Sequence, residues 1–402
     1  AKSGAAAARA TAPRAPSLLY PTPQNYIVVT DPQKNGTGMG AYTDYAVIMK
    51  LEGHDPYHVR RRYSHFFWLR EGLKRMMPAF PIPALPPKSN PFRFSKNKIV
   101  RVIGLEWFLN GVLNNPCLAK TILFKRFLTD SGDFAISQKA EDANMKSFDP
   151  AKIITERFRA ELKVLDSYTV PKQIDLRAID NLKIVELTNF MKKYVKALRN
   201  LVATSQQANN RMKVTLDSAD GLKRIFSIVA EKEKEETSVP KDYKRYDLGT
   251  VIVGWKNLLE TRPEAYDILI SVFQRDLLHA KGVLDALDAR KKLAGTFKKQ
   301  FKIEDRFKAK PPSDPVGIKR RETEKARLQA LTTALDIVDM LLIGYHMDVF
   351  WGGVKRRFDS VADHFCKDQL AMAENEVRFW QALEKDVDLA IREVKSPTSK
   401  SS

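Results

Sequence analysis

The sequence has only two cysteines and six histidines among its 402 residues, which leaves little material for thiol or imidazole chemistry. It also lacks a paired-cysteine zinc pattern, a His-Glu-x-x-His string, a Walker loop and a Gly-x-Ser-x-Gly elbow. We therefore expect no enzyme activity, no metal and no cofactor. Cys117 and Cys366 lie far apart in apolar helical contexts, so we expect two buried thiols in a reducing compartment.

Long apolar runs are missing as well. A spanning helix needs about 18 uninterrupted apolar residues, and the richest stretch, Ile337 to Tyr345, is interrupted by Asp339. We therefore expect no membrane-spanning helix. The first 19 residues contain no acid and set Lys and Arg among alanines, which is a composition shared with organelle transit peptides. Prolines recur there and break any amphipathic helix, so we expect residues 1–20 to be a disordered tail.

Positive charge is abundant. The chain has 68 Lys and Arg residues against 48 Asp and Glu residues, which gives a net charge of +20. Such a balance favours a polyanionic partner, either nucleic acid or the anionic face of a membrane. The sequence has no groove-reading motif and no basic platform interleaved with aromatic residues, so we expect no nucleic acid and favour a membrane.

The N-terminal part is predicted to be an α+β module spanning residues 21–130. Residues 25–63 form β-rich runs typical of a three-stranded antiparallel sheet. The Gly-rich segment 35–40 joins two strands and opens no helix, so we interpret it as a hairpin turn and not as a nucleotide loop. Helices are predicted over 66–76, with Ser64 as its cap, and over 96–113 and 119–128.

The remainder is predicted to be mostly helical. Residues 131–172 read as a polar linker, and residues 173–396 as three long helices, with a short tail over 397–402. Pro263 is expected to kink the second helix, and Gly352 with Gly353 to weaken the third. A heptad seam indicates a coiled coil in the third helix: Leu328, Leu331, Leu335, Val338, Leu342, Tyr345 and Val349. We predict an all-α domain of three long, kinked coiled-coil helices.

The run from Arg60 to Ser64 is the strongest candidate for binding chemistry. It ends a strand and begins a helix, where free backbone N–H groups and the helix dipole favour an anion. An arginine there can bind a phosphate with two parallel hydrogen bonds, and the flat face of Tyr63 suits a sugar-like ring. The alternative is an ordinary basic strand edge beside a core tyrosine.

Three separated strings then resemble the phosphoinositide-binding PX domain of the sorting nexins. They are residues 61–66 (Arg-Arg-Tyr-Ser-His-Phe), the Pro-x-x-Pro-x-Lys loop 83–88, and Arg101 ahead of Gly104-Leu105-Glu106. The family usually has an acidic residue where His65 stands. We interpret His65 as a solvent-facing residue at a helix start.

The resemblance implies binding of phosphatidylinositol 3-phosphate. Arg62 would bind the 3-phosphate, and the Tyr63 ring would pack under the inositol. Lys88 would meet the 1-phosphate and Arg101 the 4- and 5-hydroxyls. A planar cation suits the discriminating phosphate and a point charge suits the looser one, which agrees with these roles.

Two segments are candidates for membrane insertion. Phe92 follows the lysine loop, as an inserting aromatic residue does in the resembling domains. Within the linker, a basic amphipathic helix is predicted whose apolar stripe consists of Ile154, Phe158, Leu162 and Leu165. The alternative is an ordinary helix that packs this stripe on a neighbouring domain. Its position between the PX-like module and the long helices resembles the SNX-BAR sorting nexins.

The long helices resemble a BAR domain, an antiparallel dimer with a basic membrane face. Candidate membrane-facing residues are Lys192, Lys193, Lys196, Arg199, Arg290, Lys291, Lys292, Lys319, Arg320 and Arg321. Each cluster taken alone is more often a solvated coiled-coil face, and only the total charge and the PX-like neighbour favour membrane contact.

Together, the resemblances imply a peripheral protein on the cytosolic face of endosomal membranes. It would form a homodimer or a heterodimer with another SNX-BAR protein and sense or induce curvature for tubule formation, cargo sorting and recycling. A link to the retromer core or to cargo is a further implication by analogy. The alternative is a coiled-coil tether or scaffold that its PX domain localises to membranes without remodelling them.

Overall fold

A computed structural model describes the following residues of the chain: 25–50, 55–78, 80–88, 97–132, 134–146, 181–235, 248–260 and 265–395. The chain divides into two compact units. The first comprises Ala1–Ala197 and Arg275–Lys355, and the second comprises Leu198–Gln274 and Arg356–Ser402.

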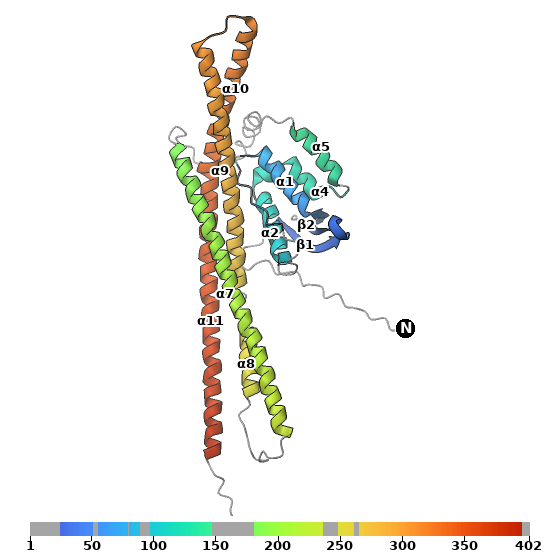
Figure 1. Cartoon of the computed structure of the whole chain (residues 1–402), viewed down its shortest axis with the longest axis vertical. Coiled ribbons are helices and arrows are strands. Elements are labelled where there is room, and N and C mark those ends of the chain that lie inside the picture. Colours follow the sequence, from blue (N-terminus) through green and yellow to red (C-terminus); the bar gives the residue numbers. More distant parts are fainter. Residues whose placement is uncertain are drawn as a thin grey trace, which may run out of the picture. The chain divides into compact units, whose positions relative to one another are not determined.

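The first unit contains a three-stranded antiparallel sheet in the order β1-β2-β3 (Figure 1), as predicted. Its strands are β1 (Tyr26–Asn35), β2 (Tyr42–Lys50) and β3 (Tyr57–Arg62). Side chains alternate between the two faces of a strand, and the residues that face the core are apolar, for example Ile27, Val29 and Val47. A positive φ at Gly36 (75°) and at Gly38 (65°) reverses the chain between β1 and β2, which confirms the hairpin.

Among the described residues, five helices complete this α+β part of the first unit: α1 (Tyr63–Met76), α2 (Asn97–Leu113), α3 (Pro116–Ala119), α4 (Ile122–Thr129) and α5 (Phe134–Lys146). Their apolar faces meet the sheet in one core that includes Phe66, Phe108, Phe124 and Phe127, each at most 1% exposed. Cys117 is buried in this core, as predicted.

Three local details differ from the sequence predictions. Arg62, and not Ser64, is the N-cap of α1, because β3 runs without a break into the helix. The predicted helix 119–128 begins later, at Ile122, because the Thr121 hydroxyl accepts a hydrogen bond from Phe124 N–H as an N-cap. Helix α5 lies within the range that we predicted as linker, and its Phe134 is buried against the Trp68 ring.

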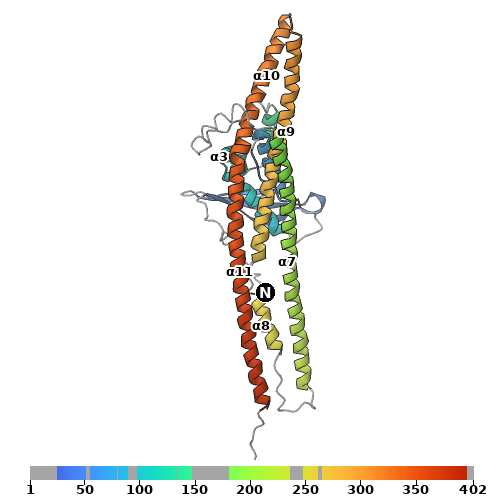
Figure 2. The same cartoon turned by 90° about the vertical axis from the view of Figure 1, so that its left-hand side faces the viewer.

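The long helices predicted for the second half are present (Figures 1 and 2). They are α7 (Asn181–Glu235), α8 (Leu248–Glu260), α9 (Ala265–Ala309), α10 (Pro315–Asp339), the π-helical segment η3 (Met340–His346) and α11 (Met347–Lys395). The fold is therefore an α+β domain joined to an all-α domain of long helices. The kink predicted at Pro263 lies outside the described residues.

The predicted heptad seam is buried or half-buried through α10 and η3 and shifts after η3. Leu331, Val338 and Leu342 are buried, whereas Val349 is 53% exposed and Phe350 takes the buried place. A π-helical turn holds more residues than an α-helical turn, so η3 moves the buried face forward along the sequence. Helix α11 continues through Gly352 and Gly353, so the irregularity lies in η3 and not at these glycines.

Within the second unit, aromatic pairs join α8 and α9 to α11. Trp255 lies 6.4 Å from Trp380 between ring centroids, and Tyr266 lies 5.4 Å from Phe365. Cys366 is exposed on α11. The prediction of two buried thiols is therefore wrong for Cys366, because its side chain lies on the solvent-facing side of α11 in this unit.

By length and composition alone, the continuous helix Pro315–Leu389 contains one 18-residue window apolar enough to cross a membrane, with a mean hydropathy of 1.3. The core helix of a soluble protein meets the same criterion, so this is weak evidence for a span. Packing accounts for part of the apolar character, since Ile337, Val338 and Leu341 belong to the hydrophobic core of the first unit.

His346 ends η3 and is 5% exposed, with its ring 4.6 Å from that of Phe80. Burial lowers the pKa of His346 from its ordinary value of 6.5 to about 3. The folded chain therefore keeps this imidazole neutral at pH values where the unfolded chain protonates it. Because the unfolded state then binds more protons, the stability falls as the pH falls from the unfolded pKa toward the folded one.

We predict that acidification from about pH 7 to about pH 5 lowers the free energy of unfolding through His346 by up to about 2 kcal/mol. In His346→Gln this part of the pH dependence is absent. Urea denaturation of both proteins at the two pH values, followed by circular dichroism, measures the difference. Equal losses in both proteins would show that His346 does not supply the pH dependence.

Candidate headgroup-binding site

The four predicted headgroup residues come from three segments that meet at the start of α1. Arg62 ends β3, and Tyr63 is the first residue of α1. Lys88 ends the Pro-rich loop, which we define as residues 80–88, and Arg101 lies on α2. The strand turns directly into the helix, so the arginine and the tyrosine stand at the helix N-terminus, where backbone N–H groups favour an anion.

Tyr63 connects these segments. Its hydroxyl donates a hydrogen bond of 2.7 Å to the carbonyl oxygen of Pro86 in the Pro-rich loop. The Arg101 guanidinium lies over its ring, 5.5 Å from the centroid. Burial raises the pKa of the Tyr63 phenol, so the hydroxyl stays protonated and remains a donor. One side chain thus fixes the distance between the arginine of α2 and the loop that carries Lys88.

Arg101 has unused hydrogen-bonding capacity. Its Nη1 atom is 3.4 Å from the Tyr45 hydroxyl. Its Nε and Nη2 atoms are buried and have no hydrogen-bond partner among the residues that the structure describes. A guanidinium carries five N–H donors, and burying them unpaired costs free energy. A ligand that presents oxygen acceptors over Tyr63 would satisfy them.

Arg62 is oriented by a residue that the sequence interpretation missed. Its Nε donates to Nε2 of His65 over 2.9 Å, and its guanidinium lies 5.7 Å from the Tyr42 ring centroid. The His65 ring lies 4.8 Å from the Phe134 ring. The interpretation of His65 as solvent-facing is therefore wrong. The available signal was the spacing, since residues i and i+3 are neighbours on a helix.

Lys88 lies at the exposed end of the Pro-rich loop. Pro86 is buried, whereas Pro87 and Lys88 are exposed. The structure shows no hydrogen bond or ion pair for the Lys88 ammonium among the described residues. As a compact point charge on a flexible stem, it can meet a second phosphate without strict geometry.

The three consecutive arginines have three different surroundings. Alternation along β3 turns Arg61 toward the core and leaves Arg60 and Arg62 on the opposite face, where each has different neighbours. Arg60 lies on the outer face, paired with Asp44 (2.5 Å) and Asp31 (2.8 Å). Arg61 is 2% exposed and donates to the carbonyl oxygens of Phe127 (2.8 Å) and Asp130 (2.5 Å). Burial lowers the pKa of Arg61 to about 10, so it stays charged at neutral pH. Arg62 alone faces the site.

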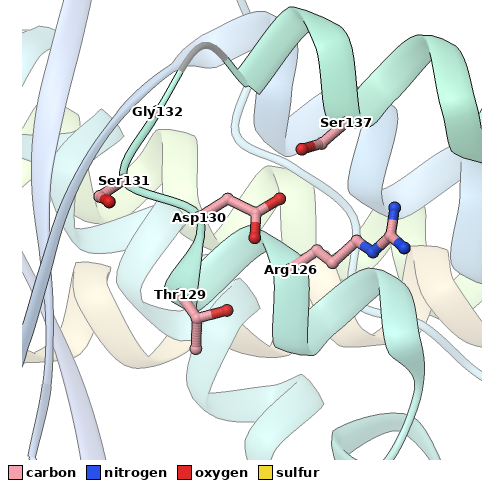
Figure 3. A pocket seen from close by; sticks show the side chains of 6 residues that line it. All are labelled: Arg126, Thr129, Asp130, Ser131, Gly132 and Ser137. Atoms are coloured by element: carbon pink, nitrogen blue, oxygen red, sulfur yellow. The ribbon is translucent and has the colours of Figure 1, made fainter.

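A polar pocket lies elsewhere, where α4 meets α5 (Figure 3). The residues that line it are Arg126, Thr129, Asp130, Ser131, Gly132 and Ser137. Its arginine is paired with Glu141 at 2.7 Å, and the Asp130 carboxylate stands in the same wall. This pocket contains none of the four predicted headgroup residues, and its acids do not favour an anion.

The remaining predicted membrane contacts fall into four groups, the last of which is Arg290. Phe92, Ile154, Phe158, Leu162 and Leu165 lie outside the described residues. Side chains exposed on the long helices are those of Lys192, Lys193, Lys196, Arg199, Lys291, Lys292, Lys319 and Arg320. Arg321 is half-buried, 4.0 Å from Glu304.

Arg290 is the one predicted membrane-facing residue that the structure contradicts. It is 7% exposed, and two hydrogen bonds of 2.8 Å join its Nε and Nη2 atoms to the Asp339 carboxylate. A buried cation needs such a partner. Arg290 therefore holds α9 to the end of α10 and is not available to a membrane surface.

The described part of the chain offers no cluster of metal ligands. No group of three or more His, Cys, Asp or Glu side chains there is placed to hold a metal ion.

Comparison with known proteins matches residues 49–131 to the PX domain family. Sorting nexin-3 of Neurospora crassa is 38% identical over 110 residues, which cover 25% of this chain and 75% of that protein. Sorting nexin 1 of Arabidopsis thaliana is 40% identical over 124 residues, and sorting nexin-18 of Mus musculus is 36% identical over 104 residues. These matches span only 30% and 16% of the latter two proteins.

The long helices are included in a structural match. The solved structure described as the SNX-BAR Mvp1 tetramer has a TM-score of 0.62 and 16% sequence identity. The match covers 89% of this chain and 99% of that one. The two chains therefore share the fold of the PX domain and of the helical domain that follows it.

Neighbouring arginines of β3 provide a test of the site geometry. We predict that Arg61→Lys lowers the free energy of unfolding by about 1–3 kcal/mol, because a lysine cannot donate to several buried carbonyl oxygens in one plane. Arg62→Lys is the matched control and should change it by less than about 0.5 kcal/mol. Urea denaturation measures both. Equal destabilisation by the two substitutions would contradict the assigned surroundings.

Proposed function

Because the chain belongs to the sorting nexin family, with the PX and BAR fold of its SNX-BAR members, we propose that it binds phosphatidylinositol 3-phosphate through the site centred on Tyr63. The observation that carries this proposal is the Arg101 guanidinium, which lies over the Tyr63 ring and whose buried Nε and Nη2 atoms have no hydrogen-bond partner among the described residues. An inositol ring above Tyr63 would place its hydroxyls within reach of those donors.

In this proposal each cation has a distinct task. Arg62, oriented by His65, binds the 3-phosphate with its planar guanidinium. Lys88 meets the 1-phosphate, and Arg101 binds the 4- and 5-hydroxyls. Two phosphates and two hydroxyls then face three cations and one aromatic ring. We therefore expect a headgroup that has only the 1-phosphate to bind less tightly.

We further propose that the helical domain dimerises and contacts the membrane, as a homodimer or with another SNX-BAR protein. Exposed apolar side chains on α7, among them Phe190, Val214 and Ile225, support an apolar partner surface. The exposed lysines of α7, α9 and α10 support contact with anionic lipid. Two headgroup sites in one dimer raise the effective concentration at the membrane without any new contact.

The biological role that follows is peripheral association with endosomal membranes on their cytosolic face. There the protein would sense or induce curvature for tubule formation, cargo sorting and recycling, with the retromer core or cargo as partners. The proposal includes no enzymatic step and no nucleic acid. The predicted insertions by Phe92 and by the stripe in residues 154–165 belong to the same proposal.

Cosedimentation with liposomes tests the headgroup site. We predict that the chain pellets with liposomes containing phosphatidylinositol 3-phosphate and that Arg62→Ala weakens this binding about tenfold or more at physiological salt. Arg60→Ala is the matched control, since it removes the same charge two residues away and outside the site. Equal binding to any anionic liposome, indifferent to Arg62, would contradict the proposal.

Electron microscopy of the same liposomes separates remodelling from tethering. We expect the unmodified chain to convert liposomes that contain phosphatidylinositol 3-phosphate into tubules, because two headgroup sites and a basic helical surface act together on one membrane. Arg62→Ala should form none at the same protein concentration. Bound but undeformed liposomes would favour a coiled-coil tether or scaffold.

A further inference from the structure

The Pro-rich loop that carries Lys88 rests on helix α9. Ala84 N–H in the loop donates a hydrogen bond of 2.9 Å to the carbonyl oxygen of Leu278 on α9. Within a helix, the carbonyl of residue i accepts from residue i+4, so the loop shares the acceptor of Gly282. This contact joins the small α+β domain to the helical domain inside the first unit.

Gly282 makes this close approach possible. A Cβ atom at that position would lie 2.4 Å from the carbonyl oxygen and 2.8 Å from the carbonyl carbon of Ile82, which are both backbone atoms. Real Cβ atoms do not approach backbone that closely, so any side chain at residue 282 pushes the loop away from α9. The glycine is thus required by the loop and not by the helix.

Asp285 completes the contact one turn further along α9. Its Oδ2 atom accepts from Nη2 of Arg70 over 2.5 Å and lies 3.4 Å from Nζ of Lys74. Arg70 is 8% exposed, and its Nε donates to the carbonyl oxygen of Pro83 over 2.9 Å. One guanidinium therefore joins the loop backbone to the carboxylate of α9.

Leu278, Gly282 and Asp285 are spaced by four and three residues, which places them on one face of α9. Phe80 adds a contact at the start of the loop, with its ring 4.6 Å from that of His346. Ile82 is 1% exposed and Ala84 is 9% exposed, whereas Pro87 and Lys88 face solvent. The loop is thus held on α9 up to Ala84 and emerges only at its lysine end.

Only three residues, Leu85, Pro86 and Pro87, separate Ala84 from Lys88, so this part of the loop is short and stiff. Two of them are prolines, which restrict φ and favour an extended chain. At the midpoint, Tyr63 holds the carbonyl oxygen of Pro86. A displacement of the loop at Gly282 is therefore transmitted to Lys88 and to Tyr63 instead of being absorbed between them.

We propose that Gly282 and Asp285 of α9 are positioning residues for headgroup binding and that they act through the Pro-rich loop on Lys88. This inference rests on the proposed function of the site. Its consequence is reciprocal, because a coupling between two elements works in both directions. A headgroup bound at Lys88 stabilises the seating of the loop on α9, and a change at α9 alters the affinity for the headgroup.

The test uses the full chain and inositol 1,3-bisphosphate, the soluble headgroup, in isothermal titration calorimetry. A soluble probe removes the contribution of the basic helices to membrane binding. We expect Asp285→Asn and Gly282→Ala each to weaken binding about fivefold. Asp288→Asn is the matched control, since it removes a carboxylate from an exposed position of the same helix, and should change affinity by less than about twofold.

Combination with Lys88→Ala distinguishes positioning from a general loss of structure. If the two α9 residues act mainly through the lysine, Asp285→Asn weakens binding by a clearly smaller factor in the Lys88→Ala background than in the unmodified chain. Equal weakening in both backgrounds, or no weakening in either, would overturn the inference. Thermal unfolding of each variant shows whether it is folded, and the isosteric Asp285→Asn serves if Gly282→Ala does not fold.

The two proposals fail in different ways. If the unmodified chain binds inositol 1,3-bisphosphate and Arg62→Ala does not, the headgroup site stands, and the α9 variants alone decide the inference. If the unmodified chain shows no binding that depends on Arg62, the headgroup site itself is wrong, and the inference about α9 is wrong with it.

Discussion

The hydrogen bond from the Tyr63 hydroxyl to the carbonyl oxygen of Pro86 is the contact on which the proposed site depends. It joins the first residue of α1 to the Pro-rich loop, while the same ring carries the Arg101 guanidinium of α2 on its face. Three segments that are distant in sequence therefore meet at one side chain. Without this contact, no side chain among the described residues would hold both the loop that carries Lys88 and the Arg101 guanidinium in place.

The proposed site contains cationic side chains that, among the described residues, have fewer carboxylate and carbonyl partners than the structural arginines of the chain. Arg60, Arg61 and Arg70 show how the chain satisfies a guanidinium when its task is structural, with carboxylates or backbone carbonyl oxygens. Arg101 and Lys88 lack such partners in the described part of the chain. The contrast matters because buried N–H donors without acceptors, such as those of Arg101, cost stability, and a ligand that supplies oxygen atoms recovers it.

Local sequence patterns predicted the fold class, the three strands and the long helices, because these depend on short-range periodicity. The candidate headgroup residues could be named from a family resemblance, and their roles remain predictions. Contacts between residues distant in sequence could not be predicted from local patterns. Nothing local distinguishes Arg290, which is buried against Asp339, from the exposed Lys291 beside it. Nor does the spacing of α9 reveal that Asp285 pairs with an arginine 215 residues away.

The most direct measurement is a crystal structure of the chain with inositol 1,3-bisphosphate bound. The account predicts the 3-phosphate on the Arg62 guanidinium, the inositol ring over Tyr63, the ring hydroxyls on Arg101 and the 1-phosphate beside Lys88. A headgroup bound on the exposed lysines of the long helices, with the Tyr63 ring uncovered, would contradict it.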